Sequence, residues 1–336
     1  MLAADRRAAE RLAWARATLD DAALTLQSAS SDASFRSYWR TVGGGRSLIV
    51  MDAPPAQEDL PAWLAIGARL RAAGLNAPQV HAQNLAEGFL LIADLGRRLY
   101  LPELRDDSAD ALYGDAMDAL LRMQQAVDAS DLPAYDDAFL LREMRLLPEW
   151  FLGRHLGIDV DARRRQALED AFAVLLGSAR EQPQVFVHRD FHSRNLLVTP
   201  RDNPGIIDFQ GALRGPLAYD LASLLRDCYV RWDDTRVEAW AEGYRQRLRG
   251  AGLIGADIDP PRFRRWFDLI GLQRHIKVLG LFCRLHYRDG KPGYLADLPR
   301  VLGYVLDVAA RHPGLASLAA LLDEAVGNRD ISQAAG

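Results

Sequence analysis

Apolar residues recur along much of this chain at the three-and-four spacing that places them on one face of a helix. Residues 4–27 show this spacing at Leu12, Ala15, Leu19, Ala23 and Leu26. Beyond residue 107, the same pattern predicts helices over 108–127, 136–155, 161–179, 232–252 and 262–286, with two more before the C-terminus. The N-cap candidates of three of these helices are Ser108 and Asp110 for the first, Asp136 or Asp137 for the second, and Asp161 for the third.

Shorter apolar runs separated by turn residues predict strands in the first hundred residues. Alternation over 34–40 and the β-branched run 47–51, with three glycines at 43–45 between them, predict a hairpin. Because no Gly-Lys-Ser/Thr follows the glycines, they fit a hairpin turn better than a phosphate loop. A helix is expected over 61–73, ending at Gly74, followed by two strands at 79–82 and 88–93.

The residues richest in chemistry lie in the middle of the chain, on loops between apolar runs. The sequence 188–195 reads His-Arg-Asp-Phe-His-Ser-Arg-Asn, and an apolar hairpin pattern then leads to Asp208. Mg²⁺ prefers hard oxygen ligands from one or two side chains together with phosphate and water, and Asn195 and Asp208 can supply such oxygens. Asp190 can then face the acceptor hydroxyl as its base. The spacing therefore favours metal-assisted phosphoryl transfer from a nucleotide.

The pattern His-x-Asp-x4-Asn with a later Asp-Phe resembles the catalytic loop and metal-binding Asp of the protein-kinase-like fold. His192 in place of the protein-kinase lysine, and Asp-Phe-Gln at 208–210, make it more similar to the aminoglycoside phosphotransferase branch. The resemblance implies an α+β, bilobal fold. A small N-terminal lobe with an antiparallel sheet would span residues 1–95, and a larger, mostly helical C-terminal lobe would span 96–336.

The resemblance also implies a role for each residue of the catalytic loop. Asp190 would orient and deprotonate the acceptor hydroxyl, while Asn195 and Asp208 would hold the Mg²⁺ that accompanies ATP. His192 and Gln210 are expected to shape the site where the γ-phosphate meets the acceptor. Structural roles, bracing the loop, are expected for two further residues, His188 and Asp220.

The nucleotide site is expected in the first lobe. The turn that covers the phosphates would include Ser34, Phe35 and Arg36, and the hinge at 92–95, with Asp94 and Leu95, would hold adenine through backbone groups.

The chain departs from the family pattern on the third strand, where such folds usually carry a phosphate-pairing lysine. Met-Asp-Ala-Pro-Pro stands at 51–55 instead, and the lysines of the chain are Lys277 and Lys291. Either an arginine such as Arg36 or Arg40 grips the phosphates through its planar fork, or the chain is a weak or inactive kinase. The alternative for Arg36 is a solvated strand arginine.

Composition excludes several other classes of protein. The 336 residues are 49% apolar and 26% charged, and no apolar run is long enough to span a bilayer. A net charge of −4 gives no electrostatic footprint for nucleic acid. Cys228 and Cys283 lie in apolar stretches that read as helical, and they are expected to be free core thiols. We therefore expect a cytoplasmic monomer without a nucleic-acid or membrane partner. His155, near a predicted helix C-terminus, is expected at the surface.

Charge also bears on the acceptor. Residues 262–300 contain nine basic residues and three aspartates, so an acceptor bound there would be neutral or anionic, unlike a polycationic aminoglycoside. Arg262, Arg264 and Arg265 fit a solvated helix face, whereas Arg274 and Lys277 interrupt an apolar helix and are candidates for substrate binding.

The segments 51–55, 188–195, 208–210 and 273–277 together resemble the anomeric sugar kinases of peptidoglycan recycling. Those enzymes phosphorylate N-acetylmuramate and N-acetylglucosamine at C1. The resemblance implies an ATP-dependent sugar 1-kinase that acts on a small amino sugar on the route to UDP-N-acetylmuramate. The alternatives are another small-molecule kinase, such as an antibiotic kinase, and a nucleotide-binding pseudokinase.

Overall fold

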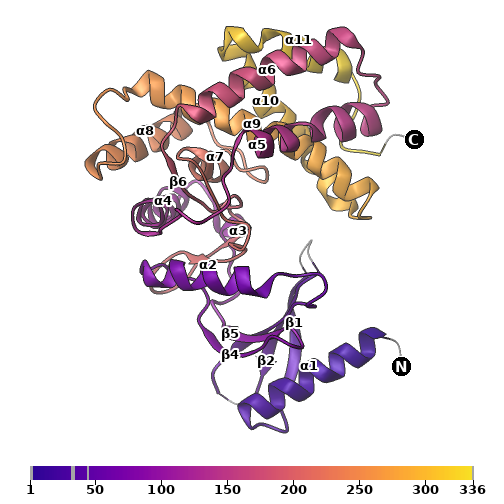
Figure 1. Ribbon diagram of the computed structural model, residues 1–336, viewed down its shortest axis with the longest axis vertical. Helices are drawn as coiled ribbons and strands as arrows, with labels where there is room; N and C mark the ends of the chain where they lie inside the picture. The colour runs from indigo at the N-terminus through magenta and orange to yellow at the C-terminus, as the bar shows by residue number, and fades with distance from the viewer. Residues whose placement is uncertain (1–2, 32–34, 44, 335–336) are drawn as a thin grey trace. The chain divides into compact units, whose positions relative to one another are not determined.

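The computed structural model describes residues 3–31, 35–43 and 45–334. The chain divides into two compact units. The first comprises Met1–Glu103 and Asn195–Gln210, and the second comprises Leu104–Arg194 and Gly211–Gly336. The α+β class is confirmed, with a small antiparallel sheet in the first unit and a mostly helical second unit (Figure 1).

The first unit is built on a five-stranded antiparallel sheet with the strand order β1-β2-β3-β5-β4. Its strands are β1 (Thr25–Ser31), β2 (Ser37–Val42), β3 (Leu48–Asp52), β4 (Val80–Asn84) and β5 (Phe89–Ala93). The predicted hairpin is confirmed, because β2 and β3 pair across the glycine turn with Trp39 opposite Val50. The two strands predicted at 79–82 and 88–93 are β4 and β5.

The N-terminal helix is shorter than the sequence pattern predicts. Helix α1 (Ala3–Leu19) ends at a turn in which Asp20 has a φ of +52° and the Asp21 side chain accepts a hydrogen bond from the Ala23 amide. The prediction of helix over 4–27 is therefore wrong for its last part, which forms β1. Leu24 and Leu26 still pack into the cluster under α1, because alternate strand residues face one side of the sheet.

Helix α2 (Leu60–Ala72) follows its local signals closely. The Asp59 carboxylate accepts a hydrogen bond from the Ala62 amide at the N-terminus. Gly74 follows the helix with a φ of +73°, a conformation that glycine adopts without strain. The Trp63 ring of this helix packs against Phe209, with ring centroids 5.0 Å apart.

The segment 195–210 belongs to the first unit although the chain has by then passed through the second. It forms the predicted hairpin of β7 (Leu196–Leu197) and β8 (Gly205–Ile206). Bridges from Asn76 to Gly205 and from Leu99 to Leu197 attach it beside the short helix α3 (Tyr100–Glu103). Asn195 and Asp208 flank this hairpin, so its pairing brings them together.

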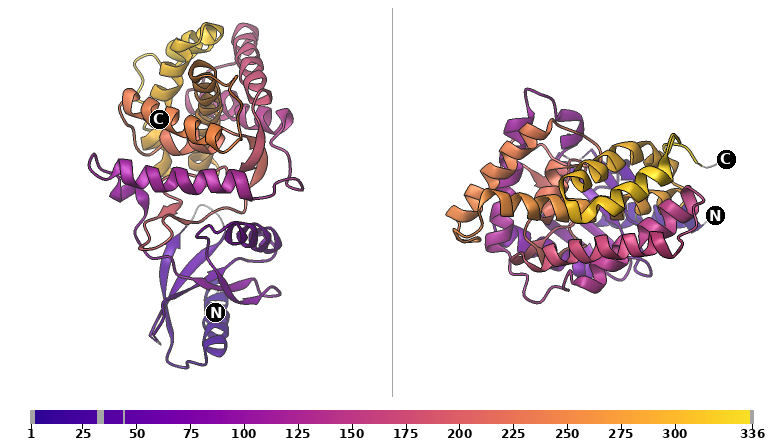
Figure 2. Two further views of the ribbon diagram at one scale, coloured as in Figure 1. Left: turned by 90° about the vertical axis from the view of Figure 1, so that its left-hand side faces the viewer. Right: turned by 90° about the horizontal axis from the view of Figure 1, so that it is seen from above.

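The second unit is a helical assembly around the long helix α9 (Pro260–Tyr287), whose middle is buried (Figure 2). Helix α9 packs against α6, α7, α10 and the π-helix η1. Two strands, β6 (Gln184–Val187) and β9 (Leu213–Pro216), pair antiparallel beside these helices. The remaining elements are α4 (Ala109–Ala126), α5 (Asp137–Met144), η1 (Leu147–His155), α6 (Ala162–Arg180), α7 (Tyr219–Leu225), α8 (Asp234–Gly250), η2 (Pro292–Asp297), α10 (Leu298–Arg311), η3 (Pro313–Leu315) and α11 (Ala316–Val326).

Three expectations for the second unit are corrected. The helix predicted over 136–155 is two elements, because α5 ends at Met144 and the π-helix η1 follows. His155 is buried rather than exposed, since its ring nitrogens lie 3.0 Å from the Tyr287 hydroxyl and 2.9 Å from the Ile331 carbonyl oxygen. Cys228 lies just beyond α7 and outside any helix, although it and Cys283 are both buried and free.

Among the described residues, no helix combines the length and apolar character that crossing a bilayer requires.

Candidate active site

A buried carboxylate holds the start of the catalytic loop, which leaves β6 at His188. Asp220, in α7, accepts hydrogen bonds from the His188 amide at 2.6 Å and the Arg189 amide at 3.0 Å. Arg189 has a φ of +76°, and these two bonds fix that uncommon conformation. Burial raises the pKa of Asp220 to about 7, and the two amide donors act in the opposite direction. The His188 ring in turn accepts a hydrogen bond from the Asp190 amide at 3.3 Å.

A second buried carboxylate, Asp227, holds the other end of the loop. It accepts hydrogen bonds from the Ser193 amide at 2.9 Å and from the Ser193 hydroxyl. Its other oxygen accepts from the Tyr229 amide at 3.0 Å. Sequence reasoning missed Asp227. The only signal was an aspartate within an apolar stretch, seven positions after Asp220.

Positive charge surrounds Asp190 and keeps it ionised. Burial alone would raise the pKa of this carboxyl, but nearby positive charges, at neutral pH those of Lys277 and Arg189, outweigh burial, and the pKa lies below its ordinary value. Burial lowers the pKa of His192, so this imidazole is neutral at pH 7. Asp190 therefore has the charge state of a base at neutral pH.

Glu143 of α5 neutralises two of the cations near Asp190. Its carboxylate lies 2.7 Å from Arg189 Nη2 and 3.2 Å from Lys277 Nζ, and it also accepts a hydrogen bond from the Tyr135 hydroxyl. Burial alone would raise the pKa of Glu143, but the charges of Lys277 and Arg189 bring it below its ordinary value. Sequence reasoning missed Glu143 because nothing near it in the chain marks it as a partner of the loop.

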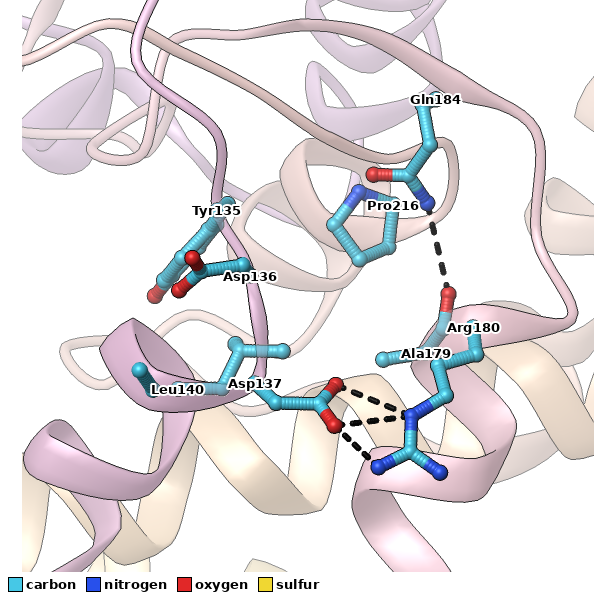
Figure 3. Close-up of a pocket in the computed structure, with 9 residues that line it drawn as sticks. Tyr135, Asp136, Asp137, Leu140, Ala179, Arg180, Gln184 and Pro216 are labelled. Carbon is cyan, nitrogen blue, oxygen red and sulfur yellow. Dashed lines mark hydrogen bonds and ion pairs between the residues drawn. The ribbon is translucent and has the colours of Figure 1, made fainter.

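A pocket of about 510 Å³ lies beside Tyr135, between α5, the end of α6 and the β6–β9 pair (Figure 3). An ion pair between Asp137 and Arg180 crosses one side of it, and the Gln184 side chain donates to the Ala179 carbonyl. None of the residues that the sequence predicts for nucleotide or acceptor binding lines this pocket.

The first unit carries the expected metal-binding pair. Asn195 Nδ2 lies 3.4 Å from Asp208 Oδ2, across the base of the β7–β8 hairpin. The other carboxylate oxygen, Oδ1, accepts from Arg36 Nη2 at 3.0 Å and from Gln210 Nε2 at 2.8 Å. Asp208 has a φ of +62°, an uncommon conformation for a residue other than glycine.

Comparison with known proteins decides the family. Residues 25–264 match the profile of the phosphotransferase enzyme family. The chain belongs to this family of phosphotransferases. It is 47% identical over 297 residues to an N-acetylmuramate/N-acetylglucosamine kinase of Pseudomonas aeruginosa, covering 88% of this chain and 86% of the relative. It is 46% identical over 302 residues to the kinase of the same name from Pseudomonas putida, covering 89% and 88%.

The fold of this phosphotransferase also has solved counterparts. A choline/ethanolamine kinase family protein from Mesorhizobium loti superposes with a TM-score of 0.62 at 14% identity, covering 94% of this chain and 99% of the other. At this identity the likeness shows the shared fold alone.

The donor set of the phosphotransferase fits Mg²⁺. A carboxylate and a carboxamide lie side by side, and both offer the hard oxygens that this ion prefers. In the described part of the chain there is no group of three or more His, Cys, Asp or Glu side chains that could hold a metal. Mg²⁺ bound with nucleotide needs only one or two protein ligands, because phosphate and water supply the rest.

The residues expected to bind nucleotide differ in how far the structure describes them. Ser34 lies outside the described residues. Phe35 is 66% exposed and its amide donates to Glu58 Oε1 at 3.1 Å, while Arg36 is buried and pairs with Glu58 and Asp208. Arg36 is thus not a solvated strand arginine.

Asp94 and the third strand have partners of their own. The Asp94 carboxylate accepts two hydrogen bonds from Arg40, at 2.6 and 2.9 Å, so a contact of this segment with adenine would come from its backbone. Burial alone would raise the pKa of Asp94, but hydrogen bonds from the Arg40 side chain, the Ser47 hydroxyl and the Gly96 amide bring it below its ordinary value. On β3, Asp52 forms ion pairs with Arg7 and Arg11 of α1, so this acidic residue has partners within the first unit.

Proposed function

We propose that this phosphotransferase uses ATP and Mg²⁺ to phosphorylate the anomeric C1 hydroxyl of N-acetylmuramate, N-acetylglucosamine or both. The product is the sugar 1-phosphate, an intermediate on the way to UDP-N-acetylmuramate in cell-wall recycling. Identity of 46% and 47% to two kinases named for these sugars supports the substrate class. The observation that carries the reaction type is the Asn195–Asp208 donor pair, which begins five residues after the ionised Asp190.

The proposed reaction needs one proton acceptor and well-placed charge. Asp190 takes the proton of the C1 hydroxyl while the hydroxyl oxygen forms a bond to the γ-phosphorus of ATP. The bond from the γ-phosphorus to the β–γ bridging oxygen breaks at the same time and releases ADP. Asn195 and Asp208 would hold Mg²⁺, which neutralises phosphate charge when bound. Arg36, which donates a hydrogen bond to Asp208, would contribute a guanidinium to the phosphates.

The other assignments of the proposal follow from this reaction. Residues 1–95, with Phe35, Arg36 and the hinge residues Asp94 and Leu95, serve the nucleotide. Residues 96–336 serve the acceptor through His192, Arg274 and Lys277, and Gln210 acts beside Asp208. We propose a cytoplasmic location, because ATP is supplied in that compartment. The proposal also includes that the enzyme is a monomer and that its acceptor is a small amino sugar.

Phosphorus NMR of the protein with ATP, Mg²⁺ and each sugar tests the proposal directly. The expected result is a new phosphate resonance coupled to an anomeric proton, appearing together with ADP. Intact ATP in the presence of both sugars would refute the substrate assignment. A sugar phosphate coupled to a non-anomeric proton would preserve the kinase and refute the C1 position.

The first mutational prediction concerns the two carboxylates of the reaction. We expect Asp190→Ala and Asp208→Ala each to lower turnover at least ~100-fold, because one removes the base and the other a metal ligand. Coupled measurement of ADP release gives the rate. Asp202→Asn is the matched control, since Asp202 is an exposed residue of the same hairpin and asparagine tolerates its φ of +49°. Normal turnover in either alanine variant would contradict the proposed roles.

A further inference from the structure

Buried cationic side chains in this protein have carboxylate partners, with one exception in the described part of the chain. Seven Lys or Arg residues are buried there. Six of them form ion pairs with Asp or Glu, a rule that the cost of burying an isolated charge explains. These six are Arg11, Arg36, Arg40, Arg226, Arg245 and Lys277.

The exception is Arg274, in the middle of α9, which is only 4% exposed. Its Nη1 donates to the Cys228 sulfur at 3.1 Å. Within residues 3–31, 35–43 and 45–334, no carboxylate lies within ion-pair distance of it, and its Nε and Nη2 make no hydrogen bond. Neither nitrogen is a fully buried polar atom without a hydrogen-bond partner, so both keep some contact with solvent.

Cys228 does not balance the charge of Arg274. Burial raises the pKa of the Cys228 thiol, so the sulfur is uncharged at neutral pH and is a weak acceptor. The guanidinium is therefore nearly buried and fully charged, and no carboxylate of the described residues forms an ion pair with it, although Asp227 and Asp190 act on its charge from a longer distance. A site of this kind is prepared for an anion that arrives from outside the chain.

The position of Arg274 ties it to the acceptor. It lies three residues before Lys277 on α9, and its charge acts on both Asp190 and His192. Lys277 is already neutralised by Glu143 at 3.2 Å. Arg262 and Arg264 are exposed and Arg265 is half-buried, and they pair with Asp257, Glu238 and Glu181.

We infer that Arg274 binds the carboxylate of an anionic acceptor, and that it is the residue by which the enzyme recognises the lactyl carboxylate of N-acetylmuramate. The inference rests on the proposed function. N-acetylglucosamine has no such carboxylate, so its phosphorylation does not use this contact. Arg274 is thus a specificity-determining residue, separate from the groups that carry the reaction.

Replacing Arg274 tests the inference by comparing two acceptors in the same protein. Arg274→Gln removes the charge and keeps a polar side chain of similar length. We expect the KM for N-acetylmuramate to rise about 10- to 100-fold, the loss that accompanies removal of a charge-assisted hydrogen bond. The KM for N-acetylglucosamine is expected to rise much less, whereas any fall in turnover caused by removing the charge near Asp190 is expected to be equal for the two sugars. Activity with N-acetylglucosamine also reports that the variant folds.

A change in the substrate gives the same test without altering the protein. The methyl ester of N-acetylmuramate keeps the lactyl group and loses its charge. Wild-type enzyme is expected to bind the ester about 10- to 100-fold more weakly than the acid, and Arg274→Gln is expected to bind both equally. Arg265→Gln is the matched control, since it removes an arginine of the same helix that already pairs with Glu181, and it is expected to leave the preference for the acid intact.

Each result has a distinct meaning. Equal use of the acid and the ester by the wild type, or an equal rise in the KM for both sugars in Arg274→Gln, overturns the inference and leaves the kinase assignment standing. If neither sugar is phosphorylated by the wild type, the proposed function fails and the inference falls with it. If Arg274→Gln does not fold, Arg274→Lys and the ester comparison decide, because lysine keeps the charge and offers a single donor centre.

Discussion

Asp227 holds the half of the catalytic loop that leads to Asn195. Its two oxygens accept three hydrogen bonds, two of them from Ser193, and the residue is fully buried. Together with Asp220 it places one carboxylate at each end of the loop that carries Asp190 and His192. Both carboxylates come from the segment 219–227, so one short stretch of chain sets the conformation of the whole loop.

We predict that Asp227→Ala lowers turnover about 10- to 100-fold with little change in the KM for the sugar, because it frees the loop and leaves buried donors without an acceptor. Asp227→Asn keeps one oxygen acceptor and should recover part of the loss. Steady-state kinetics of both variants, with Ser193→Ala as a milder comparison that spares the backbone bond, measures the effect. Equal kinetics in the wild type and Asp227→Ala would show that the loop needs no second brace.

For single residues, the sequence reveals functional residues that lie close together in one motif, but it does not reveal which distant residues pair in the fold. Asp190, Asn195 and Asp208 stand out because their pattern lies within 19 consecutive residues between apolar runs. Glu143 pairs with Arg189 across 46 positions, and Asp227 pairs with Ser193 across 34. Such pairs depend on how helices pack, and nothing near either acidic residue in the sequence specifies its partner.

Helices were predictable where the spacing of apolar residues and an N-cap residue indicated the same start. Helices α5 and α6 begin after aspartates whose side chains accept from the backbone, Asp136 and Asp161, as the sequence predicts. Strand β1 was missed because Ala23 and Leu26 continue the helical spacing of the residues before them. The break after α5 has a local cause, since Pro148 has no backbone N–H to donate to the carbonyl of Met144, the last residue of α5.

Gly280 gives a prediction at the level of helix packing. A Cβ at this position would meet the Leu146 carbonyl carbon and oxygen at 2.2 Å, so Gly280→Ala must push α9 away from the start of η1. We expect it to lower the free energy of unfolding by about 1–3 kcal/mol, as overpacking does. Urea unfolding followed by circular dichroism measures the change.

Gly243→Ala is the matched control for Gly280→Ala. Gly243 is also inside a helix, α8, but a Cβ there would meet nothing within 4 Å. The same substitution should therefore raise stability by roughly 0.5–1 kcal/mol through helix propensity. If both variants shifted stability in the same direction, close packing at Gly280 would not be the reason for the glycine.

On the scale of the whole molecule, the chain builds its first unit from two separate segments. Residues 195–210 return to the first unit after the chain has entered the second. Hydrophobic patterning predicts the hairpin in this segment but not its place, because the bridges at Asn76 and Leu99 depend on residues about 100 positions away. A lobe boundary near residue 95 stays a prediction.

Asp268 connects three parts of the second unit, namely α9, the segment after α7 and the segment after α10. Its carboxylate, at the start of α9, binds Arg226 beyond α7 and His312 after α10, and it lies 3.6 Å from Arg311. Burial alone would raise the pKa of Asp268, but the hydrogen bonds and charges of these partners lower it to about 2. Since an unfolded aspartate has a pKa of about 3.9, the ionised group stabilises the fold by roughly 2 kcal/mol above pH 4.

This stabilisation is lost as the pH falls from about 4 toward 2, because the carboxylate becomes protonated in the folded state as well. Asp268→Asn leaves Arg226 buried without an anion, so we expect the free energy of unfolding at pH 7 to fall by about 3–5 kcal/mol. The gap from the wild type should narrow at pH 3, where the wild-type carboxylate has lost part of its advantage. Urea unfolding at pH 7, 5 and 3 measures this gap, with exposed Asp257→Asn as the control. A gap of constant size at all three pH values would mean that side-chain shape, rather than charge, makes Asp268 important to the fold.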